Sequence, residues 1–246
     1  MSCAVQAMAR AAKRTGLHPA HAPLAILTEP RGARGSCNYC GGCWMGCHMG
    51  AISNAALTYI PAALRNGVEL RAGCMVSKIA LGKDRERAEA VEYLDARGRL
   101  YRQRARTVVL CGNAVETARL LLLSAQPGCA EGLANSSGLV GRGFMGHTRV
   151  TAKALLPRRV NAYMGPNING MIQDFYGSDD KRGFIGGYVV ALRNAQLGPV
   201  RFHRQWIRDP ALFGADLYRQ MDEKFGRSVE MHAYGEQLPH PDIVTE

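Results

Sequence analysis

The sequence predicts an α/β protein, in which strands and helices follow one another along the chain. Residues 106–111 (RTVVLC) form a continuous apolar run of the kind found in strands that are buried on both faces. A Gly112-Asn113 turn follows, and residues 114–124 (AVETARLLLLS) then contain strong helix formers throughout. A strand, a glycine turn and a helix in this order form the arrangement with which α/β proteins hold a ligand at the carboxyl end of a sheet.

Further helices and strands are expected on both sides of this unit. The opening helix runs to about Gly16, with Val5, Met8, Ala9 and Ala12 spaced for one face. Residues 17–36 are rich in Pro and Gly and favour a loop, and Pro61 is expected to break or kink a helix over 53–66. Short β-type runs are expected at 68–71, 75–81, 88–94 and 100–102. An apolar run at 184–192 and a polar helical stretch at 216–225 follow.

The composition indicates a folded protein without a membrane-spanning segment. Of the 246 residues, 47% are hydrophobic and 21% are charged, which excludes wholesale disorder. No apolar run approaches the ~20 residues that a membrane-spanning helix needs. The net charge is +11, but the basic residues are spread along the chain with few aromatic residues among them, so a solvated surface is favoured over nucleic-acid binding. The amino terminus does not have the pattern of a secretory signal, and we expect a cytoplasmic protein.

Four of the eight cysteines fall within eleven residues, and these are Cys37, Cys40, Cys43 and Cys47. Their C-x2-C-x2-C-x3-C spacing is the ligand run of bacterial iron–sulfur clusters, although Cys47 is followed by His48 instead of Pro. A tetrahedral zinc site is a second interpretation, although the usual long spacer between two ligand pairs is missing. A glycine-rich loop with free thiols is the third. The sequence leaves all three open.

One glycine-rich segment matches the dinucleotide-binding motif only by chance. Residues 141–146 (GRGFMG) match G-x-G-x-x-G, but the dinucleotide fingerprint must follow a strand and open a helix. The preceding NSSGLV is typical of turns, and no acidic residue appears until Asp174. We therefore do not assign residues 141–146 to phosphate binding.

Several longer motifs, taken in order, resemble those of the GMC (glucose–methanol–choline) flavoprotein oxidoreductases. They are CNYCGGCWMGCHMGAISNAALTYIPAALRNGVELRAGCMVSKI, then VVLCGNAVETARLLLLS, then GLANSSGLVGRGFMGH. The resemblance is to the cysteine-rich bacterial branch with gluconate and long-chain alcohol dehydrogenases. It is close over residues 30–150 and loose over 150–246.

The resemblance implies an FAD-dependent enzyme that oxidises the CH–OH group of an alcohol or a sugar acid and passes electrons to an acceptor. It places Met75 and Val76 on the strand whose backbone approaches the adenine, and Cys111 and Gly112 against the cofactor. Asn54 and Thr58 would lie near the flavin side. No catalytic residue is assigned, because neither His203, His232 nor His240 lies in a matching motif, and His147 is expected to be structural.

The resemblance also implies a division of the chain. Residues 1–29 would be a helical and loop lead-in, 30–146 a partial FAD-binding domain with a mixed sheet, and 147–246 part of a substrate domain. The family's nucleotide fingerprint and catalytic histidine have no counterpart here, so we expect an internal fragment. Two alternatives remain: an iron–sulfur or zinc-binding electron-transfer module, and an inactive remnant. The sequence does not identify the alcohol, the electron acceptor or any partner subunit.

Overall fold

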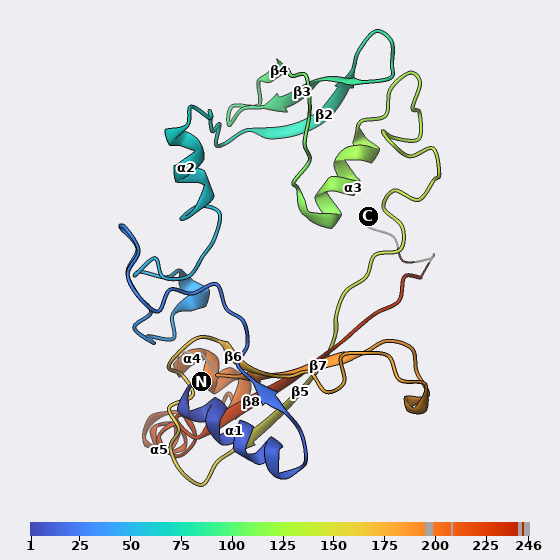
Figure 1. Cartoon of the computed structure of the whole chain (residues 1–246). Helices are drawn as coiled ribbons and strands as arrows, with labels where there is room; N and C mark the ends of the chain where they lie inside the picture. The colour runs from blue at the N-terminus through green and yellow to red at the C-terminus, as the bar shows by residue number, and fades with distance from the viewer. Residues whose placement is uncertain (195–198, 208, 241–242, 244–246) are drawn as a thin grey trace. The chain divides into compact units, whose positions relative to one another are not determined.

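The computed structural model describes residues 1–194, 199–207, 209–240 and 243. It divides the chain into two compact units (Figure 1). The first unit consists of Met1–Arg65 and His147–Gln237, and the second consists of Asn66–Gly146 and Leu238–Glu246. Residues 30–65 thus pack with the segment that was expected to belong to a substrate domain, and the assignment of functional domains stays a prediction.

The first unit is built on a five-stranded antiparallel sheet in the order β1-β6-β7-β8-β5. Its strands are β1 (Pro19–Ala20), β5 (Thr148–Leu155), β6 (Ile168–Ile172), β7 (Tyr188–Arg193) and β8 (Ser228–Gly235). Its helices are α1 (Cys3–Arg14), α2 (Tyr59–Arg65), α4 (Pro199–Phe202) and α5 (Gly214–Lys224), with further helical turns at Cys43–Met45, Asp180–Arg182 and His203–Ile207. The expected helical stretch at 216–225 is confirmed as α5, and the apolar run at 184–192 contains most of β7.

Helix α1 is confirmed, and its apolar face makes the core of the first unit. The Ser2 side chain accepts a hydrogen bond from the N–H of Val5 and so caps the helix. Val5 and Met8 are buried against β6, β7 and β8, where they join Ile172, Leu192 and Val229. Burial of one such side chain stabilises the fold by about 1.5–3 kcal/mol.

The second unit contains a three-stranded antiparallel meander with one helix against it. Its strands are β2 (Met75–Leu81), β3 (Ala88–Leu94) and β4 (Leu100–Arg104), and its helix is α3 (Asn113–Leu123). The first two strands have the predicted bounds, because each β-type run is closed by a local turn. The residue after α3, Ser124, is fully buried; its hydroxyl accepts from Ile79 N–H at 2.9 Å and ties the helix to β2.

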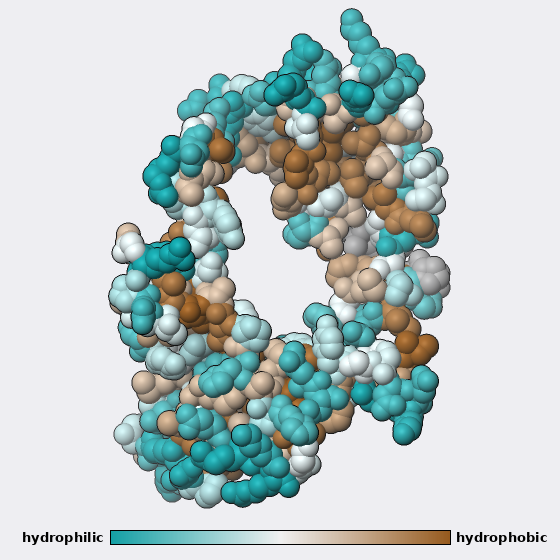
Figure 2. Space-filling view, viewed as in Figure 1, coloured by the Kyte–Doolittle hydropathy of each residue, from teal (hydrophilic) through white to brown (hydrophobic). Residues whose placement is uncertain are grey.

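The predicted buried strand at 106–111 is wrong. Residues 107–111 have no regular secondary structure, and Val109 is 77% exposed. A strand buried on both faces needs a neighbour on each edge, and no described segment pairs with this run. Figure 2 shows hydrophobic surface over α3 and the segment before it. All pairings between the described strands are antiparallel, so the expected mixed sheet is not found. The α/β class itself is confirmed.

Two smaller expectations also change. Residues 68–71 form no strand, and the expected helix over 53–66 is shortened to α2. Pro61 lies in the first turn of α2, where its missing N–H has no intrahelical partner to lose, so it does not break the helix. None of the helices in the described ranges has the length and apolar character needed to cross a membrane.

Candidate functional site

The four clustered cysteines lie on a loop that backbone hydrogen bonds fix to the rest of the first unit. The N–H of Cys37 donates to Leu27 O at 2.9 Å, and the N–H of Gly165 donates to Tyr39 O at 2.8 Å. Gly41 has φ +78°, and a Cβ added there would lie 2.0 Å from Tyr163 O. The chain can therefore pass this close to Tyr163 only with glycine at position 41.

All four cysteines line one small cavity. Its volume is about 10 Å³, which is roughly the space of one water molecule. All eight cysteines are free thiols. Within the described ranges, no group of three or more His, Cys, Asp or Glu side chains is placed to hold a metal ion. Cys37, Cys40, Cys43 and Cys47 thus border the same cavity, but the described side chains are not arranged to coordinate a metal ion.

The cysteine loop also stabilises negative charge. The N–H of Ile52 contributes most to a lowered pKa of the Cys47 thiol; burial opposes it, and the N–H groups of Ala51, Met49 and Gly50 act in the same direction as Ile52. Hydrogen bonds from backbone N–H groups favour a thiolate over a thiol. Thiolate is the form that binds metals.

Two of the expected cofactor residues, Met75 and Val76, begin strand β2 of the second unit. This strand lies at the edge of its sheet, with β3 as its neighbour. The side chains of Ser124 and Gln126 accept from the N–H groups of Ile79 and Leu81, so they occupy the later part of the free edge.

The first part of β2 borders a cavity. Val76 lines an open cavity of about 380 Å³ together with Val91 and Tyr93. At its rim, Arg71 binds Glu69 through two hydrogen bonds and reaches Tyr93 Oη at 3.0 Å. The cavity therefore combines apolar side chains with several hydrogen-bonding groups, and its volume lies in the range typical of small-ligand sites.

Cys111 and Gly112 lie immediately before α3, and both are exposed. Asn113 has φ +66°, and its side-chain oxygen accepts from the N–H groups of Val115 and Glu116. The predicted turn and the helix after it are thus confirmed, although the strand expected before them is absent.

Asn54 and Thr58 lie together in the first unit, in the turn before α2. Asn54 Oδ1 accepts from Leu57 N–H at 3.0 Å, and Asn54 O accepts from the Thr58 hydroxyl at 2.6 Å. These contacts form the turn itself. The structure thus gives Asn54 and Thr58 a local role, and it places the other four expected cofactor residues in the second unit.

Sequence reasoning missed a basic cavity in the first unit. The cavity has a volume of about 490 Å³ and is lined by Arg31, Arg34, His48 and Arg65, among others. The only acidic residue among residues 1–65 is Glu29, and this imbalance could have identified the region in the sequence.

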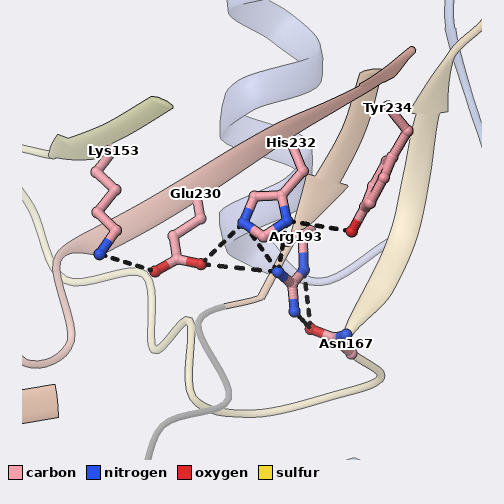
Figure 3. Close-up of polar contacts among 6 residues, drawn as sticks. All are labelled: Lys153, Asn167, Arg193, Glu230, His232 and Tyr234. Carbon is pink, nitrogen blue, oxygen red and sulfur yellow. Dashed lines mark hydrogen bonds and ion pairs between the residues drawn. The ribbon is translucent and has the colours of Figure 1, made fainter. Parts of the chain in front are cut away.

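Sequence reasoning also missed a polar network on the sheet face opposite α1. It consists of Lys153, Asn167, Arg193, Glu230, His232 and Tyr234 (Figure 3). Arg193 donates to Asn167 Oδ1 at 2.7 Å and lies 2.7 Å from Nδ1 of His232, while Glu230 Oε2 lies 3.4 Å from Nε2. Burial lowers the pKa of His232, and the positive charge of Arg193 lowers it further. None of the three cavities above is lined by these residues, and their contacts link β7 to β8.

Comparison with known proteins decides the family. A sequence model of GMC oxidoreductases matches residues 1–149. The chain belongs to the GMC oxidoreductase family. The expected resemblance is therefore confirmed, and membership of this family implies FAD as the cofactor.

Three dehydrogenases are among the relatives of this GMC chain. It is 32% identical to the 2-methyl-1,2-propanediol dehydrogenase of Mycolicibacterium austroafricanum over 87% of its own length and 39% of the relative. It is 32% identical to the gluconate 2-dehydrogenase flavoprotein of Pantoea cypripedii, over 79% and 34% of the two chains. It is 27% identical to the fructose dehydrogenase large subunit of Gluconobacter japonicus, over 89% and 40%. The GMC chain thus spans at most two-fifths of the length of these relatives.

Proposed function

We propose that this chain is part of an FAD-dependent oxidoreductase that acts on the CH–OH group of an alcohol or a sugar acid. The observation that carries the proposal is the GMC match over residues 1–149, since the relatives are named as dehydrogenases of a diol, a sugar acid and a sugar. When bound, FAD supplies an acceptor for the hydride of the carbinol carbon. One relative is a large subunit by name, so the proposal includes a partner subunit.

Of the parts of FAD, the residues around Val76 fit the adenosine end best. An adenine needs an apolar contact and hydrogen-bonding groups, and Val76 stands at an edge strand beside the 380 Å³ cavity that Val91 and Tyr93 also line. We infer that Met75 and Val76 hold this end of the cofactor, with Cys111 and Gly112 beside it. Residues 141–146 do not open a helix, so they do not offer the N-terminal amides that bind a diphosphate.

The test of this proposal is a titration of FAD into the purified chain, followed by quenching of flavin fluorescence. We expect saturable but weak binding that ADP competes away and riboflavin does not, because the proposed contacts are to adenosine. A Val76→Asp variant should lose the binding, while Val150→Asp, an equal change at an exposed position of β5, should retain it. The absence of any saturable FAD binding would contradict the adenosine assignment.

The activity itself is tested separately. We propose a dye-linked assay of the FAD-loaded chain with 2-methyl-1,2-propanediol, gluconate and fructose, which represent the three named relatives. Dye reduction that depends on both FAD and one of these alcohols would support the function. FAD binding without any alcohol-dependent reduction would restrict this chain to a cofactor-binding role.

We also propose that Cys37, Cys40, Cys43 and Cys47 bind a metal centre: an iron–sulfur cluster would relay electrons, whereas zinc, which has no redox chemistry, would stabilise the loop. The common cavity and the lowered pKa of Cys47 support this proposal. A single zinc ion fits the present cavity more readily than a cluster, around which the loop would have to open. Iron, zinc and sulfide analysis of anaerobically purified protein is the test. A metal content of zero would refute the proposal, and so would a metal content that substitution of the four cysteines by serine leaves unchanged.

A further inference from the structure

The basic cavity of the first unit is lined by Arg31, Arg34, Arg65 and His48, among other residues. It lies between the turn at 31–34, the end of the cysteine loop and the segment that leads into α2. No Asp or Glu lines it. Residues 1–65 contain six Arg and Lys residues and one carboxylate, Glu29. The cavity is therefore strongly positive.

Several arginines elsewhere in the chain have carboxylate partners. Arg99 pairs with Asp95, Arg119 with Glu116, and Arg159 with Asp222. In contrast, the side chains of Arg31 and Arg65 make no ion pair and no hydrogen bond to any described residue, and both residues are exposed. Two guanidinium groups thus face solvent around a concave site with all their donors available.

Arg34 is held in place by the cysteine loop. Its Nε donates to Gly50 O at 2.8 Å, and its Nη2 donates to Ala51 O at 3.1 Å. These carbonyl groups orient the guanidinium but do not neutralise its charge. The backbones of Arg31 and Arg34 also bond each other, at 2.9 and 3.1 Å, which keeps both residues at the same side of the cavity.

We propose that this cavity binds a small oxyanion of the phosphate or carboxylate class. The planar guanidinium presents paired donors that match the oxygens of phosphate and carboxylate groups, and several arginines around one concave site raise the local concentration of such anions. Two sources share this chemistry: the diphosphate of a flavin cofactor and the carboxylate of a sugar-acid substrate. Only the choice between these sources rests on the proposed function; anion binding itself does not.

The experiment is isothermal titration calorimetry of the full chain at low ionic strength, with inorganic pyrophosphate and gluconate as probes. The test variants are Arg31→Gln, Arg65→Gln and the double variant. Arg10→Gln is the control, because Arg10 is an exposed arginine of α1 in the same unit and does not line the cavity. We expect each single variant to weaken binding about fivefold, the double variant more than tenfold, and the control less than twofold.

The outcomes separate the possibilities. Tighter binding of pyrophosphate identifies the cofactor as the source, and tighter binding of gluconate identifies the substrate. Absence of saturable binding of both probes would overturn the proposal, and so would an equal loss in Arg10→Gln, which would indicate attraction by net charge alone. Circular dichroism confirms that the variants are folded. Since no flavin is present, a failure of FAD binding in the other assays leaves this result unaffected.

Discussion

Replacement of Gly41 by alanine should destabilise the first unit strongly, for two reasons that can be separated. Gly41 has φ +78°, and an L-residue in this conformation costs about 1–2 kcal/mol. The new Cβ would also lie 2.0 Å from Tyr163 O, a backbone atom that cannot rotate away. Forcing such a contact apart typically costs a further ~1–3 kcal/mol. We expect a loss of about 2–5 kcal/mol in the free energy of unfolding.

Gly16→Ala is the matched control for Gly41→Ala. Gly16 has φ +80°, nearly the same backbone conformation, but an added Cβ would meet no atom within 4 Å. Its expected loss is about 1–2 kcal/mol, from the backbone alone. Urea unfolding monitored by circular dichroism measures both variants. Equal losses in the two would refute the inference that the cysteine loop is packed tightly against Tyr163.

Three further outcomes are expected. Burial lowers the pKa of His232 below its ordinary 6.5, so the unfolded chain binds the proton more readily than the folded chain. The free energy of unfolding should therefore fall as the pH drops through 6.5, and His232→Gln should flatten this part of the pH profile. Ser124→Ala should cost about 1–3 kcal/mol and speed hydrogen exchange of the Ile79 amide, which loses its acceptor. Val5→Ala should lower stability by about 2 kcal/mol in thermal unfolding, while a change at the exposed Gln6 should have almost no effect.

The sequence predicted best the elements that are stabilised by near neighbours. Strands β2 and β3 were found with their bounds because they pair across a short connection, and α1 shows its apolar spacing directly. Strands β5 and β8 were not predicted, since their pairing joins residues more than 70 positions apart and leaves no local pattern. The run at 106–111 failed for a related reason: its composition indicates a strand, but strand formation depends on a partner that no local sequence reveals.

Among the candidate sites, too, only those formed by residues close in sequence could be predicted. The cysteine cluster was visible because its members are close in sequence, and the structure places all four around one cavity. Arg31 and Arg65 are separated by over thirty positions, so only the folded loop shows that they share a cavity. The network around His232 joins β7 to β8 and was equally hidden.

The exposed apolar segment at 106–110 has a consequence for how the protein behaves in solution. Its backbone is not paired with any described strand, and Arg106 at its start is its one charged residue. A segment of this kind is a template onto which another extended chain can add, first as a dimer and then as an aggregate. High yields should therefore require low protein concentration during refolding, or a charged residue at Val109, where 77% of the residue is already in contact with water.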